Sequence, residues 1–317
     1  MRFEKKLTVE HKYHSCRLDT FIFKHLKSIF SRTEIKGYIN SKMITVEGQH
    51  LKPSYRLTLD QEVFIKIENN YDSKIVPENI PINILYEDSS ILVLDKDPGM
   101  VVHPGAGNHT GTLANALAYY FKDSLKLERM GIVHRLDKYT SGIMIVAKNN
   151  NSHKILSKQF KSRQIKKVYR SIVWGKTAKR GQIDSKIVRD RYKRTKFTVG
   201  TLGKESNTNY KTLSYLEPLS YLELYPLTGR THQIRVHLSS IGKPIFGDEL
   251  YGGGPNKIKS FHCKFNAKMK YIFSSFNRFA LHAYSIELLH PETNKKINFT
   301  CSIPDDINNV IEELKSE

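Results

Sequence analysis

Gly131-Ile-Val-His-Arg-Leu-Asp137-Lys-Tyr-Thr-Ser-Gly142-Ile-Met-Ile-Val-Ala-Lys148 is the stretch around which the rest of the chain is organised. Residues 143–147 are apolar at every position, and such a short run suits a strand buried on both faces better than a helix. Polar side chains crowd the connection before this strand, namely His134, Arg135, Asp137, Lys138, Thr140 and Ser141. Polar groups beside a rigid, dry strand are typical of a catalytic or binding site. Taken alone, the stretch is equally consistent with a structural ion pair between Arg135 and Asp137.

The composition indicates the class of partner. A length of 317 residues favours one large domain plus a small one. Lys and Arg number 51 against 31 Asp and Glu, and the formal charge of +20 predicts a polyanion, with nucleic acid first and an anionic membrane second. No apolar run approaches the roughly 18 residues of a membrane span, and the N-terminus lacks the apolar core of a secretory signal. Cys16, Cys263 and Cys301 form no Cys-x-x-Cys pair, which favours a reducing cytoplasm over a thiolate zinc site.

The first 67 residues predict a small, separate domain. Residues 1–13 are expected to be a charged lead-in. Apolar residues then recur at helical spacing over 18–26 and 35–39. Short strands are expected at 43–46 and 63–67.

Basic side chains fall on or near these two expected helices. They are Lys24, Lys27, Arg32, Lys36 and Lys42. They form either a solvated basic face or a surface on which Arg32 and Lys36 contact RNA. Ser31 and Glu34 fit a capping box at the start of the second helix.

The remaining chain begins after a polar segment, 68–83, which is marked by two prolines and is expected to be a linker. Its periodicity predicts strands at 84–87, 91–94, 167–175, 221–227, 279–284 and 296–300, and helices at 112–121, 151–163 and 307–314. Residues 255–278 have no clear period and are expected to be a long surface loop or an irregular helix.

A basic segment spans residues 186–196, where six of eleven residues are Lys or Arg. It is either a disordered charged loop or a phosphate clamp. The clamp would be formed by Arg189, Arg191, Lys193, Arg194 and Lys196.

A second polar motif, Pro226-Leu-Thr-Gly-Arg-Thr-His-Gln-Ile-Arg235-Val-His-Leu238, follows an expected strand. Thr231 can cap a helix whose apolar stripe is Ile234, Leu238 and Ile241, and Gly242 ends this helix. Arg235 then lies early on a short helix, one position from the buried stripe, from which a guanidinium can point inward.

These motifs together identify a family. His134-Arg-Leu-Asp137 with Thr140-Ser-Gly142, then Tyr169, then the 226–238 motif closely resemble the RluA family of pseudouridine synthases. Val102-His-Pro-Gly-Ala-Gly107 and Gly247-Asp-Glu-Leu-Tyr-Gly-Gly253 are most similar to its RluD-like branch, which carries an N-terminal S4 domain and includes enzymes of 23S ribosomal RNA. Arg17-Leu-Asp19, Ser31-Arg32, Ile44-Thr-Val-Glu-Gly48 and Lys52-Pro-Ser-Tyr-Arg56 resemble the S4 RNA-binding module.

The resemblance implies an α+β protein with two domains. An S4-like RNA-binding domain is expected at 14–67, followed by the linker 68–83. The catalytic domain at 84–317 is expected to have a mixed, largely antiparallel sheet flanked by helices and loops. The implied partner is 23S ribosomal RNA or a large-subunit precursor. We expect a cytoplasmic monomer that contacts no membrane.

The resemblance also assigns roles to residues. Asp137 matches the catalytic aspartate, Tyr169 the tyrosine against the uracil, and Arg235 the partner of the aspartate. Arg135 matches the arginine that takes the place of the flipped base, and Arg230 and His232 join it as expected RNA contacts. One departure is Lys96-Asp-Pro-Gly99, where the family often reads Lys-Pro-x-Gly; it bears on the local turn rather than on the catalytic residues.

The reaction replaces a glycosidic N–C bond by a C–C bond without net redox change, so no cofactor is expected. The chain has no Gly-x-Gly-x-x-Gly, P-loop or His-Glu-x-x-His motif. The carboxylate can act as nucleophile or as base, and Tyr169 can stack on the uracil or also accept the C5 proton. Two rivals are a non-catalytic ribosome-assembly factor and a metal-dependent nuclease. The i, i+5 spacing of His232 and His237 splays their rings, so structural histidines are favoured there and at His134, and no metal site is expected.

Overall fold

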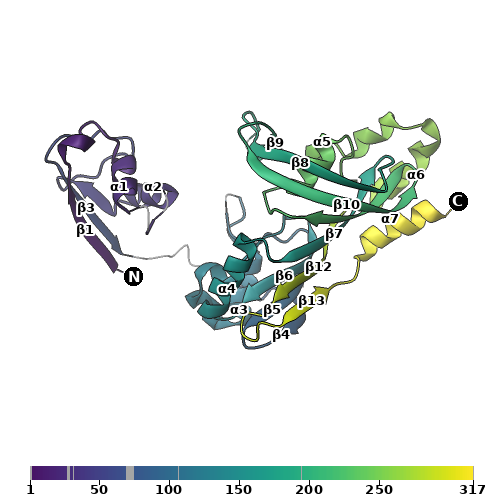
Figure 1. The fold of residues 1–317 in the computed structure, drawn as a ribbon, viewed down its shortest axis with the longest axis horizontal. Coiled ribbons are helices and arrows are strands. Elements are labelled where there is room, and N and C mark those ends of the chain that lie inside the picture. Colours follow the sequence, from purple (N-terminus) through teal and green to yellow (C-terminus); the bar gives the residue numbers. More distant parts are fainter. Residues whose placement is uncertain are drawn as a thin grey trace. The chain divides into compact units, whose positions relative to one another are not determined.

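The computed structural model describes residues 2–26, 29–30, 32–68, 75–105, 107–193 and 195–316. The chain divides into two compact units, Met1–Lys74 and Ile75–Glu317 (Figure 1). Each unit has apolar clusters of its own, so each is described separately. No helix among the described residues has both the length and the apolar character needed to cross a membrane.

The N-terminal unit packs two helices on a small antiparallel sheet. In its described part the strand order is β1-β3-β2, with β1 at Arg2–Thr8, β2 at Ile44–Val46 and β3 at Glu62–Glu68. The helices are α1, Leu18–Leu26, and α2, Arg32–Asn40, after a short 3-10 turn η1, His11–Tyr13. The apolar positions spaced for helices are buried in this core.

One expectation for this unit is wrong. The residues expected to be a charged lead-in contain strand β1, which pairs with β3 along its whole length. Phe3 and Leu7 lie on one face of β1 and pack on the core, while charged residues between them mask the alternation. Ser31, the expected N-cap, lies outside the described residues.

Within its described part, the C-terminal unit is built on a ten-stranded sheet with the order β4-β5-β6-β12-β7-β11-β10-β8-β9, and β13 also pairs with β12 (Figure 1). The strands are β4 Asn83–Glu87, β5 Ile91–Lys96, β6 Ser141–Ala147, β7 Lys166–Trp174, β8 Arg180–Arg189, β9 Phe197–Val199, β10 Lys204–Leu216, β11 Leu219–Pro226, β12 Leu281–Leu289 and β13 Lys296–Thr300. Only the pairing of β6 with β12 is parallel among those described. The expected mixed, largely antiparallel sheet is therefore confirmed.

Outside the sheet, this unit contains α-helices and short 3-10 turns. They are α3 Leu113–Tyr120, α4 Asn150–Lys161, α5 Gln233–Ser240, α6 Asn266–Ser275 and α7 Asp305–Lys315, with 3-10 turns η2 Lys122–Lys126, η3 Glu128–Gly131, η4 Glu249–Tyr251, η5 Pro255–Ser260 and η6 Cys263–Phe265. Residues 255–278, expected as a loop or irregular helix, are thus largely helical. Met269 and Ile272 anchor α6 in the core.

Strand β6 confirms the prediction that residues 143–147 are buried on both faces. Met144 and Val146 belong to one apolar cluster, which also contains Leu117 of α3. Ile143 and Ile145 belong to another cluster, which contains Leu156 of α4. Because both faces are covered, this strand is a rigid support for the polar loop that precedes it.

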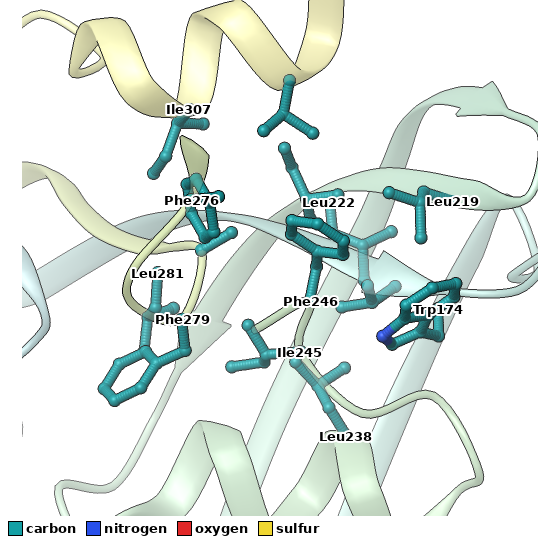
Figure 2. Close-up of a cluster of buried hydrophobic side chains, with 14 of the residues drawn as sticks. Trp174, Leu219, Leu222, Leu238, Ile245, Phe246, Phe276, Phe279, Leu281 and Ile307 are labelled. Atoms are coloured by element: carbon teal, nitrogen blue, oxygen red, sulfur yellow. The ribbon is translucent and has the colours of Figure 1, made fainter. Parts of the chain in front are cut away.

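A larger apolar cluster stabilises the other half of the sheet. Figure 2 shows its side chains between the helix that bears Ile307 and the helix that bears Leu238, with Phe246 near the middle and Trp174 at the right of the view. The indole Nε1 of Trp174 donates to the carbonyl of Gly253 at 2.8 Å, so its polar atom is satisfied inside this core. This cluster holds α5 firmly against the sheet.

Residues 75–82, expected to lie in the linker, pack on the C-terminal unit instead. Ile75 and Ile82 join the cluster around α3. The Asn115 amide donates to the carbonyl of Val76 at 2.9 Å. The prolines and polar residues that suggested a linker therefore belong to an extended segment fixed by its few apolar side chains.

Candidate active site

The loop that carries Asp137 is held by hydrogen bonds from a buried lysine, Lys96. The ammonium of Lys96 donates to the carbonyls of Asp97, Met100 and Lys138 at 2.6, 3.0 and 3.2 Å. Burial lowers the pKa of Lys96 to about 8. The amide of Gly99 also donates to the Lys138 carbonyl at 2.8 Å, so the unusual Lys96–Gly99 sequence still forms a turn that holds this loop.

Gly142 allows the same loop to lie close to β12. Its φ is +110°, and a Cβ at this position would come within 2.3 Å of the carbonyl oxygen of Ala283. The parallel pairing of His282 with Ser141 and of Ala283 with Gly142 requires this close approach. A side chain at position 142 would therefore displace the Asp137 loop from the sheet.

Asp137 and Arg235 meet as the sequence predicts. The Nη1 of Arg235 donates to Oδ2 of Asp137 at 3.2 Å. The Asp137 side chain is 19% exposed, whereas that of Arg235 is 8% exposed. The Oδ1 of Asp137 lies 3.9 Å from Nε2 of His232. One oxygen of Asp137 is therefore bonded to Arg235, while the side chain as a whole remains partly exposed.

Asp248 is the residue that fixes Arg235. It accepts two hydrogen bonds from the guanidinium, from Nε at 2.7 Å and from Nη2 at 3.0 Å. The guanidinium also lies over the rings of Tyr251 and Phe279, at 4.8 and 4.3 Å from their centres. Burial opposes the charge of Arg235, but its bonds with Asp248 and the charge of Asp137 raise its pKa above the ordinary value. Arg235 is thus a permanently charged partner for Asp137.

Helix α5 begins differently from the sequence prediction. His232, not Thr231, occupies the N-cap, with a left-handed φ of 56° and no side-chain cap. The Oε1 of Gln233 accepts from the Thr228 hydroxyl at 2.7 Å and from the Arg230 amide at 3.0 Å, which orders the loop before the helix that Thr231 was expected to cap. The ring of His232 points back to the site, where its Nδ1 lies 2.8 Å from the Tyr251 hydroxyl. Burial lowers the pKa of His232.

Tyr169 lies on the central strand β7, between β11 and β12. It lines a cleft of about 430 Å³ together with Asp137, Arg235, Arg135 and His232. Burial, helped by the negative charge of Asp137, raises the pKa of Tyr169, so its hydroxyl is protonated at neutral pH. The structure therefore brings the three expected catalytic residues together at one cleft.

The expected RNA-contacting residues are distributed over three places. Arg135 is exposed at the cleft and makes no hydrogen bond or ion pair with any described residue. Arg230 also lines the cleft, where its Nε donates to the Glu205 carbonyl at 3.4 Å. Arg32 and Lys36 belong to the N-terminal unit, where they lie 3.8 and 3.6 Å from Asp19.

The basic segment 186–196 consists of the end of β8 and the connection that joins β8 to β9. These two strands pair as an antiparallel hairpin. Arg189 lies over the Phe197 ring at 5.0 Å, and Lys196 lies over the Tyr251 ring at 5.7 Å. Arg191 and Lys193 are exposed at the tip. Arg194 lies outside the described residues.

The three histidines of the motifs have separate partners. Nε2 of His134 accepts the Ile145 amide at 2.9 Å, and its ring stacks on Phe160 at 4.6 Å. Burial lowers the pKa of His134 to about 3, so the ring is neutral. Nδ1 of His237 lies 2.9 Å from the Thr208 hydroxyl inside the protein.

Sequence reasoning missed Asp248, Tyr251 and Phe279, which surround the Arg235 guanidinium. The first two lie in the Gly247–Gly253 motif, which was singled out without a role for either side chain. A carboxylate and an aromatic residue within one glycine-rich motif were the available signal. Phe279 carries no comparable signal, because an apolar residue in an expected strand is ordinarily a core residue.

Comparisons with known proteins identify what this chain is similar to. A family model described as RNA pseudouridylate synthase matches residues 90–240. The ribosomal large subunit pseudouridine synthase D of Yersinia pestis is 38% identical over 289 residues, covering 91% of this chain and 88% of that protein. The protein of the same name from Blochmanniella floridana is 38% identical over 320 residues, covering 98% of each. The structure of Human RNA Pseudouridylate Synthase Domain Containing 4 is similar with a TM-score of 0.56 and 26% identity, covering 74% of this chain and 93% of that one.

Proposed function

We propose, from the premise that the chain belongs to the RNA pseudouridylate synthase family, that it isomerises specific uridines of 23S ribosomal RNA to pseudouridine. An enzyme of this family is an isomerase. The large-subunit target is supported by the names of the two relatives that cover most of the chain. We further propose that the enzyme acts as a cytoplasmic monomer, on mature RNA or on a large-subunit precursor.

One observation carries the catalytic assignment. Asp137 is held by Arg235 at 3.2 Å in a cleft that Tyr169 also lines. The reaction needs a carboxylate near the sugar and an aromatic surface for the uracil, and side chains of both kinds line this cleft. Because Arg235 is also held by Asp248, the position of the cation does not depend on Asp137.

The uridine must leave the RNA stack to reach this cleft, which costs roughly a few kcal/mol. Arg135 is suited to occupy the place that the base leaves, because its guanidinium is exposed at the cleft and unpaired among the described residues. Planar guanidinium groups stack on bases and bind acceptors on their edges. Arg230 and His232 line the cleft near the incoming nucleotide.

Asp137 acts next, as a nucleophile at C1′ or C6 or as a base. The C1′–N1 bond breaks, the uracil turns over against the ring of Tyr169, and a C1′–C5 bond forms. The proton on C5 leaves, and N1 ends with a proton, so the product has the same atoms as the substrate. Arg235 keeps the Asp137 carboxyl ionised in this partly dry cleft.

Tyr169 also has the position to accept the C5 proton. Its raised pKa means that the neutral hydroxyl must release its own proton as it takes the new one. Asp137, whose charge contributes to that raised pKa, is the adjacent carboxylate able to receive it. The ring and the hydroxyl of Tyr169 therefore have separable roles.

The experiment that tests this function is Asp137→Asn. We expect tritium release from C5-labelled uridine in 23S ribosomal RNA to fall by about 10⁴-fold or more, because an amide is a poor nucleophile and base. RNA binding and folding should change little, because the swap is nearly isosteric and affinity comes mainly from Lys and Arg contacts.

The matched control is Asp123→Asn, which removes an exposed carboxylate that pairs, among the described residues, with Lys126 alone. This control should release tritium at the wild-type rate. A wild-type protein that binds the RNA but releases no tritium would support the non-catalytic assembly factor instead. An Asp137→Asn variant that turns over at the wild-type rate would refute the catalytic assignment.

A further inference from the structure

Lys167 is a cleft residue that the proposed mechanism does not use. It lies two positions before Tyr169 on β7, so both side chains point to the same face of the sheet. Both line the active-site cleft. The neighbouring Lys166 points to the opposite face, where its ammonium pairs with Glu287 at 3.0 Å. The two adjacent lysines thus differ in surroundings and not in type.

The ammonium of Lys167 has no anionic or hydrogen-bonding partner among the described residues. It is half-buried, and burial lowers its pKa. Its charge also contributes to the lowered pKa of His134, which places it beside that ring. Its Nζ would lie 3.8 Å from a Cβ at Gly229, so it faces the loop on the other wall of the cleft.

An unpaired, half-buried cation costs free energy in the folded protein. Such a cation is retained where a ligand supplies the missing negative charge. Two further cations, Lys161 and Arg163, also line the cleft. Both are exposed, and neither side chain has a partner in the described part of the chain. The cleft lining therefore contains three lysine or arginine side chains from residues 161–167 without an anionic partner among the described residues.

We infer that Lys167 binds a backbone phosphate that flanks the flipped uridine, with Lys161 and Arg163 guiding the RNA strand toward it. This inference rests on the proposed function, because it takes the nucleotide in the cleft to be a uridine of RNA. Uracil and ribose are neutral, so the phosphate is the only group of that nucleotide able to neutralise the ammonium. Two residues along a strand correspond to about 6–7 Å, which separates a uracil at Tyr169 from a phosphate at Lys167.

Lys167 is proposed to position the RNA and not to react with it, so its replacement should affect KM much more than kcat. In Lys167→Met we expect the KM for a 23S ribosomal RNA transcript to rise about tenfold, while kcat changes less than about threefold. The slope of log affinity against log salt should fall by about 1, as for one lost phosphate contact. Lys167→Arg should keep most of the affinity, and Lys166→Met should behave as wild type.

A second measurement locates the phosphate. A neutral methylphosphonate is placed on the 5′ or the 3′ side of a uridine that the wild-type protein modifies. At one of these positions the replacement should weaken wild-type binding about tenfold and have almost no further effect in Lys167→Met. Equal losses in both proteins at both positions would overturn the inference, as would an unchanged salt slope in Lys167→Met.

Binding and tritium release are measured separately on the same proteins. Suppose that Lys167→Met binds RNA more weakly than the wild-type protein, but that the wild-type protein releases no tritium. This result would refute the proposed function and leave the phosphate contact standing. If the wild-type protein releases tritium and Lys167→Met has the same KM as Lys166→Met, the phosphate contact alone is refuted.

Discussion

Each unit contains a cluster of carboxylates and cations, and the two clusters differ in which of the two is in excess. In the C-terminal unit one guanidinium, Arg235, contacts two carboxylates, Asp137 and Asp248. In the N-terminal unit one carboxylate, Asp19, contacts three cations. The three cations are Arg17, Arg32 and Lys36, at 3.0, 3.8 and 3.6 Å. The formal charges are 1 − 2 = −1 in the first cluster and 3 − 1 = +2 in the second.

Exposure separates the two clusters further. The side chains of Arg235 and Asp248 are 8% and 1% exposed, so the excess carboxylate belongs to a dry site. Around Asp19, which is fully buried, the three cations are 43–54% exposed. A buried cluster with excess negative charge keeps a carboxylate ready to react. An exposed cluster with excess positive charge holds several cations at fixed spacing, which suits a phosphate backbone.

Among the changes that test this comparison of the two clusters, removal of the cation of the C-terminal cluster should have the largest effect. Arg235→Met leaves Asp137 and Asp248 without their shared partner, and we expect tritium release to fall by about 10³-fold or more. The free energy of unfolding should fall by about 3–5 kcal/mol, because buried carboxylates lose their counter-ion.

Adding Asp248→Leu to Arg235→Met should restore much of the stability but none of the activity. Thermal unfolding and tritium release measured on both variants check this. Full activity in the double variant would mean that Asp137 needs no cation. The charge difference between the two clusters would then have no bearing on catalysis.

The next effect tests whether the cleft needs more than its charges. Tyr169→Phe keeps the ring and removes the hydroxyl, and we expect turnover to fall about 100-fold with unchanged RNA affinity. Single-turnover kinetics on RNA with C5-deuterated uridine should show a new isotope effect, because deprotonation becomes slow. An active variant without that isotope effect would leave the hydroxyl with no essential role.

A smaller effect should follow from removing the N-terminal unit. Residues 75–317 contain the catalytic cluster and its complete core, so we expect this fragment to fold and to remain catalytic. Its affinity for 23S ribosomal RNA should fall about tenfold, with a flatter salt dependence, because fewer phosphates are neutralised. A fragment that binds as tightly as the intact chain, with the same salt slope, would show that the N-terminal cations do not bind RNA.

The smallest effect concerns Asp19. Burial alone would raise its pKa, but the hydrogen bonds and charge of Arg17, then the hydrogen bond from Thr20 and the charge of Arg32, bring it below the ordinary value of 3.8. Asp19→Asn should lower the free energy of unfolding by about 1–2 kcal/mol near pH 7, since the cations are partly solvated.

The pH dependence of Asp19→Asn follows from the direction of that shift. A carboxyl whose pKa is lowered by folding contributes stability above its unfolded pKa and loses it as the pH falls through the folded value. The difference between wild type and variant should therefore narrow below about pH 3.8. Catalysis at saturating RNA should stay unchanged. Urea unfolding between pH 2.5 and 7 measures this, and a constant difference across that range would contradict it.

The sequence predicts elements well where the apolar pattern is strong. The uninterrupted run 143–147 predicts a doubly buried strand, and the Asp137 and Arg235 motifs predict the pair that the cleft contains. It predicts poorly where few apolar residues decide the structure. Strand β1 has Phe3 and Leu7 among charged residues, and its partner β3 is about sixty residues away.

Contacts made by polar residues were the harder part of the site to predict. Asp248 pairs with Arg235 because a turn of η4 and the start of α5 meet, which no local pattern shows. The N-cap at His232 depends similarly on Gln233, whose side chain orders the preceding loop from inside the helix. Local rules favoured Thr231, and the tertiary hydrogen bonds decided otherwise.

The separation of Asp137 from Arg235 along the chain also sets a delay between their synthesis on the ribosome. Arg235 leaves the ribosome 98 residues after Asp137. At about 5–20 residues per second, this delay is roughly 5–20 s. The N-terminal unit, whose core is complete by Ile67, is finished well before either residue is made. The N-terminal core can therefore form before Asp137 and Arg235 are both available, and an incomplete chain without Arg235 has no charged partner for Asp137.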